Sequence, residues 1–120
     1  KEEIIMSVTI YHNPRCSKSR QALEILNNNG ASPLVKEYLK DGLSPNEVKG
    51  IYKALELESA LPLIRVKEAE FKEAGLSKES SDEEFFDALV KFPKLLERPI
   101  VITDKGARIC RPPELATEIL

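Results

Sequence analysis

The sequence lacks several features that would assign a protein to a class at once. It has only two cysteines, Cys16 and Cys110, which are too few and too far apart for an extracellular disulfide framework. No apolar run approaches the roughly 18 residues that a membrane helix requires, so we expect no membrane association. The 18 Lys and Arg against 20 Asp and Glu give a formal net charge of −2, which offers no global attraction for nucleic acid.

What the sequence does contain is the composition of a globular domain. Its 120 residues are 42% hydrophobic and 32% charged, which is enough to bury a core without disulfides. We treat residues 1–5, which precede the only methionine, as upstream sequence, and we predict a single domain over residues 6–120. No basic-then-apolar signal peptide opens the chain, and with the scarcity of cysteine this predicts a cytoplasmic protein.

The first part of the chain has the pattern of a strand, a helix and a second strand. Residues 7–11 are β-rich and end at a strand-breaking Asn-Pro pair. From Ser17, apolar side chains recur on one helical face, and the Asn-Asn-Asn-Gly run at residues 27–30 favours a left-handed helix end. A second strand over residues 34–38 would complete a βαβ unit.

The middle of the chain is predicted to be helical. Capping boxes start helices at Ser44, with Pro45 in the first turn, and at Ser81. A charged segment around residues 66–75 lies between them and also has helical character.

The end of the chain returns to β-structure. Residues 100–103 and 107–110 flank Asp-Lys-Gly, which fits a β-hairpin, and Pro112-Pro113 can start a last helix. The predicted order is therefore β-α-β, several helices, then β-β-α. This is a thioredoxin-like α/β plan, a mixed sheet with a helical insertion between its βαβ and ββα halves.

Cys16 is the residue whose position in this plan favours chemistry. It lies where the first strand gives way to the first helix, so that unpaired backbone N–H groups and the positive end of the helix dipole face its sulfur. Cationic neighbours lower the pKa of such a cysteine from about 8.5 to roughly 3.5–7.5. The candidate cations are His12, Arg15, Lys18 and Arg20. The alternatives are a buried apolar role for Cys16, an ordinary polar role for His12 and a solvated helix start, which we favour for Arg15 and Lys18.

The motif around this cysteine excludes one form of redox chemistry. It reads Cys-Ser-Lys-Ser, so Ser19 occupies the position of the second cysteine in a C-x-x-C pair, and a local disulfide cannot form. Cys110 is a candidate resolving thiol, but packing at the end of a β-rich run is the favoured interpretation. A Cys16 thiolate beside a bound oxyanion would instead be a nucleophile towards it.

Four segments together resemble the glutaredoxin-dependent arsenate reductases, and the resemblance covers nearly the whole chain after Met6. They are HNPRCSKSR from residue 12, LIR at 63–65, ERPIVIT at 97–103 and RICRPPE at 108–114. In that family a cysteine attacks arsenate to form a thioarsenate adduct, glutathione adds, and glutaredoxin reduces the mixed disulfide. The resemblance implies a role in arsenical resistance.

Carried over residue by residue, the resemblance implies a site. Cys16 would be the nucleophile, His12 would favour its thiolate, and Asn13, Ser19 and Pro99 would support the site. Arg65, Arg98 and Arg111 would bind the oxyanion, for which phosphate or sulfate would be mimics, because a guanidinium pairs two donors with tetrahedral anions. The resemblance also implies a cis Arg98-Pro99 bond, no metal, no tightly bound cofactor, glutathione as co-substrate and glutaredoxin as partner.

Three other classes compete with this one. A regulator of the Spx type binds RNA polymerase and senses oxidation through C-x-x-C, against which Ser19 counts. A monothiol, glutaredoxin-like thiol transferase needs no cluster of arginines. A tyrosine-phosphatase-type reductase carries C-x5-R, whereas Ala22 stands at that position here. The first two remain alternatives, and the third is set aside.

Overall fold

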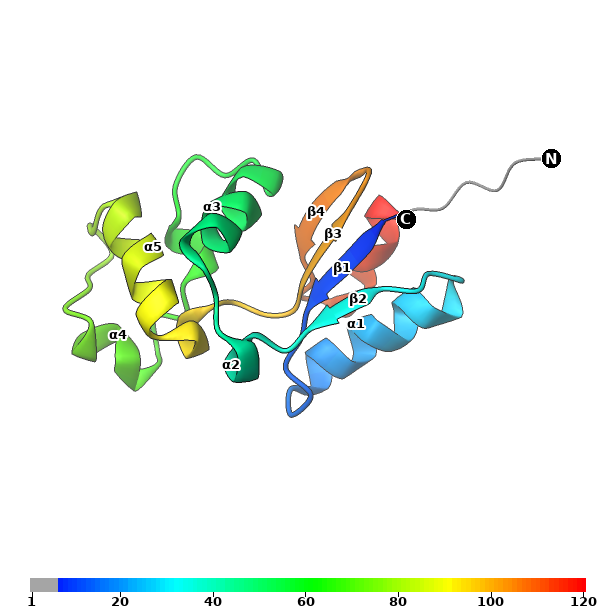
Figure 1. Ribbon diagram of the computed structural model, residues 1–120, viewed down its shortest axis with the longest axis horizontal. Helices are drawn as coiled ribbons and strands as arrows, with labels where there is room; N and C mark the ends of the chain where they lie inside the picture. Colours follow the sequence, from blue (N-terminus) through cyan, green and yellow to red (C-terminus); the bar gives the residue numbers. More distant parts are fainter. Residues whose placement is uncertain (1–6) are drawn as a thin grey trace. The chain divides into compact units, whose positions relative to one another are not determined.

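The computed structural model describes residues 7–120 and has the predicted order of elements (Figure 1). Its elements are β1 (Val8–Tyr11), α1 (Ser17–Asn28), β2 (Leu34–Lys36), α2 (Tyr38–Asp41), α3 (Pro45–Ala54), η1 (Leu61–Leu63), α4 (Ala69–Glu73), α5 (Asp82–Lys91), η2 (Pro93–Leu95), β3 (Ile100–Thr103), β4 (Gly106–Ile109) and η3 (Pro113–Ile119), where η marks a 3₁₀ helix. Within the described part of the chain, no helix is both long and apolar enough to span a membrane.

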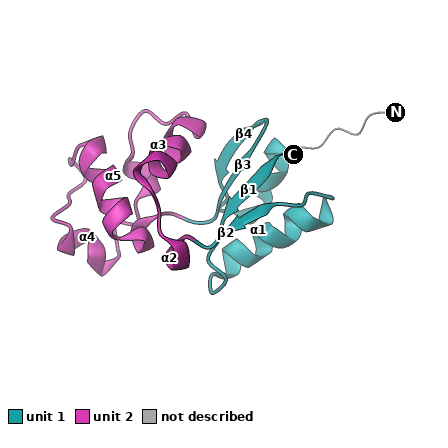
Figure 2. Ribbon diagram, viewed as in Figure 1, with its two compact units in different colours: residues 1–37, 98–120 teal, residues 38–97 magenta. Residues whose placement is uncertain are grey.

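The chain divides into two compact units (Figure 2). Unit 1 joins the described residues up to Glu37 with Arg98–Leu120, and unit 2 is Tyr38–Glu97. Unit 2 is the predicted helical insertion, and unit 1 contains the βαβ and ββα halves on either side of it. That the two units form a single domain stays a prediction.

Unit 1 is built on a four-stranded mixed sheet in the order β2-β1-β3-β4. Strand β1 pairs in parallel with β2, with Ile10 opposite Val35, and antiparallel with β3, with Ile10 opposite Val101. The predicted hairpin is confirmed, because β3 and β4 pair antiparallel. The sheet and its helices confirm the predicted α/β, thioredoxin-like class.

One face of this sheet holds the core of unit 1. Because paired residues in neighbouring strands share a face, Val8, Ile10 and Val101 lie together, and α1 and η3 pack over them. The buried cluster consists of Val8, Ile10, Ala22, Leu26, Val101, Cys110, Ala116 and Ile119. The apolar spacing predicted for α1 is confirmed, since Ala22 and Leu26 are fully buried.

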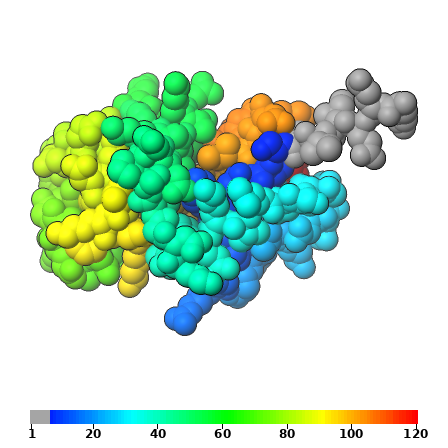
Figure 3. Space-filling view, in the orientation of Figure 1, coloured from blue at the N-terminus to red at the C-terminus, as the bar shows by residue number. Residues whose placement is uncertain are grey.

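Strand β2 is an edge strand and is largely uncovered. Leu34 is 58% exposed and Val35 39%, and Figure 3 shows this segment, in cyan, at the surface of the molecule. The strand ends at Lys36 rather than at residue 38 as predicted. Strand β1 stops at Tyr11 ahead of Pro14, so the last inter-strand bond in this ladder runs from His12 N–H to the Lys36 carbonyl at 2.8 Å. Tyr38 lies beyond the end of this ladder and begins α2.

Two further boundaries differ from prediction for local reasons. Gly106 was predicted within the hairpin loop, but it pairs with Thr103 in the ladder, which leaves a two-residue loop of Asp104 and Lys105. Its φ of 143° explains why glycine stands there. The last helix is 3₁₀ rather than α, and its backbone bonds span three residues, as from Leu115 N–H to the Pro112 carbonyl at 3.1 Å.

Both predicted capping boxes are formed in unit 2. The Ser44 hydroxyl accepts from Glu47 N–H at 3.0 Å, and the Ser81 hydroxyl accepts from Glu84 N–H at 3.2 Å. Each glutamate returns a hydrogen bond to the serine N–H. Helices α3 and α5 then pack through an edge-to-face pair of Tyr52 and Phe86, whose ring centroids are 5.2 Å apart.

Candidate functional site

The loop between β1 and α1 places Cys16 at the N-cap of the helix. Cys16 has extended backbone angles, and its carbonyl accepts from Arg20 N–H at 3.0 Å, which starts the helical bonding. The loop is tightened by two bonds to Asn13, whose carbonyl accepts from Cys16 N–H at 2.9 Å and whose Oδ1 accepts from Arg15 N–H at 3.0 Å. The predicted strand-to-helix position of the cysteine is confirmed.

The sulfur of Cys16 is surrounded by hydrogen-bond donors. Partial burial opposes ionisation, but the N–H of Ser19, the hydrogen bond and charge of the Arg98 side chain, and the N–H of Lys18 outweigh it and lower the pKa of Cys16. The thiol remains partly accessible to solvent. A partly exposed thiol that ionises readily at a helix N-terminus is equipped to act as a nucleophile.

Arg98, beside this thiol, also has a buried nitrogen without a hydrogen-bond acceptor among the described residues. This nitrogen is the Nε of its guanidinium. A buried N–H without an acceptor is costly and rare in folded proteins, so it marks a place where an acceptor is expected. Arg111 adjoins it, because Arg111 Nη1 donates to the Arg98 carbonyl at 3.0 Å. The predicted cis Arg98-Pro99 bond is confirmed, and Pro99 is buried.

Arg65, the third predicted oxyanion ligand, belongs to unit 2 and is already paired with carboxylates. Its guanidinium lies 3.0 Å from Glu68 and 3.8 Å from Glu97, the residue that precedes Arg98. Its backbone N–H donates to the Leu95 carbonyl at 2.8 Å. The convergence of Arg65 with Cys16 stays a prediction.

His12 and Ser19 form a buried polar pair behind the loop. His12 Nδ1 lies 2.7 Å from Ser19 Oγ, which also accepts from Asn13 N–H at 3.0 Å. Burial is the main reason that the pKa of His12 is lowered, with Glu37 opposing and Arg20 adding to the shift. Neutral imidazole is therefore favoured near pH 7, and the donors that lower the pKa of Cys16 are Ser19, Arg98 and Lys18.

The other cysteine has the opposite surroundings. Cys110 is fully buried in the core of unit 1, and its thiol is within 3.7 Å of the Arg108 carbonyl. Burial raises the pKa of Cys110 to about 12. Packing, the favoured interpretation for this residue, fits its burial in the core.

Two structural features of unit 1 were not predicted from the sequence. The sequence predicts Arg20 as a candidate cation, and the structure adds that its Nη1 donates to the Pro14 carbonyl at 2.9 Å and so ties the helix back to the loop. The Arg111-Pro112 bond is also cis. Position i+4 from Cys16 on a helix was the available signal for Arg20, whereas nothing in the sequence alone distinguished this second Arg-Pro bond.

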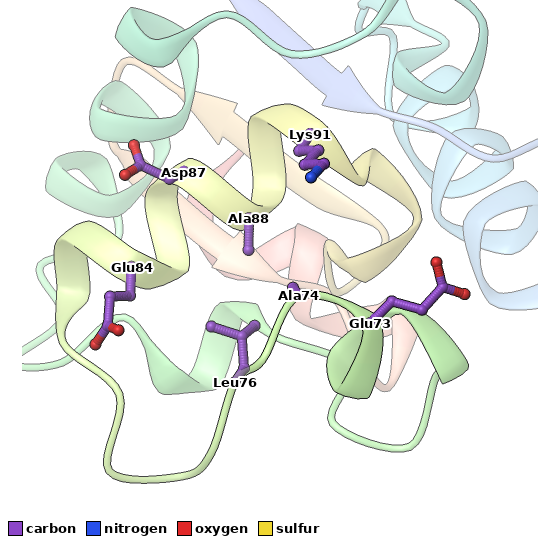
Figure 4. A pocket seen from close by; sticks show the side chains of 7 residues that line it. All are labelled: Glu73, Ala74, Leu76, Glu84, Asp87, Ala88 and Lys91. Carbon is purple, nitrogen blue, oxygen red and sulfur yellow. The ribbon is translucent and has the colours of Figure 1, made fainter.

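A separate hollow of about 260 Å³ in unit 2 lies between α5 and the segment that includes α4 (Figure 4). The carboxylates of Glu73 and Glu84 lie on opposite sides of it, with Leu76 and Ala88 between them (Figure 4). Within residues 7–120, no cluster of three or more His, Cys, Asp or Glu side chains is arranged to hold a metal ion. The candidate site is therefore the one at Cys16, where a thiol with a lowered pKa lies beside Arg98.

Comparison with known proteins places this arrangement in a family. The ArsC family matches residues 11–119. Escherichia coli K12 has an uncharacterized protein, YfgD, that is 46% identical over 114 residues, covering 94% of this chain and 96% of that one. An arsenate reductase of Haemophilus influenzae is 43% identical over 116 residues, covering 96% of this chain and 100% of its own length. The solved structure of an arsenate reductase from Vibrio cholerae is 46% identical, with a TM-score of 0.91 over 98% of this chain and 100% of that one. The chain belongs to the ArsC family.

Proposed function

We propose that this protein reduces arsenate to arsenite, with Cys16 as the nucleophile. The observation that carries the proposal is the buried, unpartnered Nε of Arg98 beside a thiol whose pKa is lowered. The Arg98 Nε–H can donate to an acceptor such as an oxyanion oxygen, and the Cys16 thiolate would be a nucleophile next to that anion. The relative from Haemophilus influenzae, named arsenate reductase, supports arsenate as that oxyanion.

In the proposed site, arginines neutralise the substrate. Arg98 and the adjoining Arg111 each present donors to arsenate oxygens, and Arg65 is the third proposed ligand. A thiolate and an arsenate dianion repel each other, so positive groups around the reacting centre offset the repulsion and stabilise charge in the transition state. His12, Asn13 and Ser19 hold the loop that carries the nucleophile, and Pro99 positions the strand entry beside Arg98.

The first proposed step forms a bond between Cys16 and arsenic. The thiolate attacks arsenate, an S–As bond forms, an As–O bond breaks, and the oxygen leaves as water after protonation. Glutathione then makes a second As–S bond with loss of another water. Arsenic is still pentavalent at this point.

The second proposed stage transfers the electrons. A glutaredoxin thiolate attacks the glutathione sulfur, forming a disulfide and breaking its bond to arsenic, whose electron pair stays on the now trivalent arsenic. Water then releases arsenite and regenerates the Cys16 thiol. Two thiols become one disulfide for the two electrons that arsenic gains, so the scheme uses no metal and no tightly bound cofactor. We place this activity in the cytoplasm, where both thiol partners stay reduced.

The test is arsenate-dependent oxidation of NADPH, coupled through glutathione, glutaredoxin and glutathione reductase. We expect turnover that requires all three thiol components and is lost in Cys16→Ser but retained in Cys110→Ser. Silence towards arsenate together with turnover of a glutathionyl disulfide would contradict the proposal and favour a thiol transferase.

A further inference from the structure

Arg15 and Lys18 are exposed cations on either side of Cys16 in the sequence. Within residues 7–120, neither side chain forms an ion pair or hydrogen bond. The first turn of α1 contains no acidic residue, and Glu24 is the first carboxylate along the helix. The protein as a whole carries a net charge of −2, so this is a local excess of positive charge.

These two cations differ from the other basic residues of unit 1 that adjoin Cys16. Arg98 donates to the Cys16 sulfur, Arg111 to the Arg98 carbonyl and Arg20 to the Pro14 carbonyl. Arg15 and Lys18 instead point their charge into solvent, where they act on whatever approaches the thiol from outside. An approaching reactant with negative charge would be favoured.

We propose that Arg15 and Lys18 form a docking surface for the carboxylates of a small peptide thiol that reacts at Cys16. The inference rests on the proposed function, in which such a thiol adds to the arsenic held by Cys16. It identifies which residues of this chain select that co-substrate by its charge.

The spacing of the two cations fits a small peptide with two anionic ends. Arg15 and Lys18 are three residues apart, so their Cα atoms are at most about 11 Å from each other. Glutathione, the thiol of the proposed function, is a γ-glutamyl tripeptide of about this reach, and its γ-linkage leaves a free carboxylate on each side of the cysteine.

The test compares disulfide probes that differ only in charge. The Cys16 thiolate attacks one sulfur of a symmetrical disulfide; a new S–S bond forms, the old one breaks, and the other half leaves as a thiolate. The probes are 3,3′-dithiodipropionate (anionic), bis(2-hydroxyethyl) disulfide (neutral) and cystamine (cationic). Dividing each rate constant by that of the neutral probe removes any change in the ionisation of Cys16.

We expect the double variant Arg15→Glu/Lys18→Glu to lower the anionic-to-neutral ratio about tenfold at low ionic strength and to raise the cationic-to-neutral ratio. The neutral variant Arg15→Gln/Lys18→Gln should give a smaller change in the same direction. Both effects should shrink in 0.5 M salt, because exposed charges are screened there. Cys16→Ser supplies the background rate.

The matched control is Lys49→Glu/Lys53→Glu, the same change of two cations to two anions, on exposed side chains of α3. An unchanged ratio in the Arg15→Glu/Lys18→Glu variant, or an equal fall in the control, would overturn the proposal. The exchange needs no arsenate, so it is separable from the proposed function: absent arsenate turnover with a changed ratio rejects only the reductase activity. Normal turnover with an unchanged ratio rejects only the docking surface.

Discussion

At the scale of single residues, the two cysteines of unit 1 show how surroundings decide reactivity. Cys16 receives hydrogen bonds from two backbone N–H groups and from Arg98, which together lower its pKa. Cys110 lies in an apolar cluster where burial raises its pKa to about 12. The same side chain therefore ionises more readily at the helix start and stays protonated in the core.

The first prediction concerns alkylation by iodoacetamide. We expect Cys16 to react with a pH midpoint below the free-thiol value of about 8.5, because its thiolate is stabilised, and Cys110 to stay unmodified in the folded protein. Mass spectrometry of Cys16→Ser and Cys110→Ser across pH 5–10 measures both. Equal labelling of the two cysteines, or a midpoint at the free-thiol value, would contradict this.

The second prediction concerns Arg98. Arg98→Ala should raise the pKa of Cys16, since it removes a charge and a hydrogen bond, and should weaken oxyanion binding roughly ten- to a hundredfold through the loss of about 1.5–3 kcal/mol. Arg98→Lys should rescue this only in part, because an ammonium lacks the planar pair of donors. Oxyanion binding is measured as the protection that sulfate or arsenate gives Cys16 against alkylation by iodoacetamide.

The matched control for Arg98 is Arg108→Ala, which also removes a guanidinium from unit 1. Arg108 bonds to Glu118 at 3.0 Å and to the Ala107 carbonyl at 2.7 Å. We expect this control to keep the parent pH midpoint and the parent protection by sulfate. If both variants lost protection equally, net charge rather than the position of Arg98 would explain the effect.

At the scale of elements, the helix starts are set by local chemistry. The third prediction is that Ser81→Ala destabilises the protein by about 1 kcal/mol, because it leaves Glu84 N–H without its side-chain acceptor. Urea unfolding followed by circular dichroism measures this. Ser32→Ala, at an exposed serine outside the helices and strands, should change the free energy of unfolding little; a similar loss there would speak against the capping argument.

Features that depend on residues close together in the sequence could be predicted, whereas features that depend on distant strands could not. The starts of α3 and α5 were predictable because a capping box lies within four residues. The end of β2 was not, since it depends on where β1, its partner strand, stops. The pairing of Gly106 within β4 likewise depends on register with Thr103, which composition alone does not specify.

The candidate site divides in the same way. The loop from His12 to Ser19 is local, so the position of Cys16 at the N-cap was readable from the residues. The contact between Arg98 and Cys16 joins positions 82 residues apart and came only through family resemblance. The pairing of Arg65 with Glu68 and Glu97 was not foreseen, because a basic residue in a chain rich in carboxylates has many equivalent partners in sequence.

At the scale of the whole molecule, the only histidine allows stability to be linked to one titration. The pKa of His12 is lowered in the folded protein, so near pH 6 the unfolded chain binds more protons. Stability from this group is present above the unfolded pKa of about 6.5 and is lost as pH falls through the lower folded pKa.

The fourth prediction follows from that linkage. The free energy of unfolding, measured in urea, should fall from pH 7 to pH 5.5, and His12→Asn should flatten this dependence even if it is less stable overall. The window lies above the usual range of carboxyl titration, so few other side chains contribute. A parent protein whose stability is constant or increases as pH falls through this window would contradict the argument.

The division of unit 1 between the two ends of the chain has a consequence for the order of folding during synthesis. Unit 2 is a continuous stretch, Tyr38–Glu97, whose partners emerge from the ribosome close together in time. Strand β1 is made early but pairs with β3, with Val8 opposite Thr103, across 95 positions of chain. The sheet that presents Cys16 beside Arg98 can therefore close only after most of the protein has been translated, so the nascent chain carries Cys16 long before it has the arginine that helps to lower the pKa of this thiol.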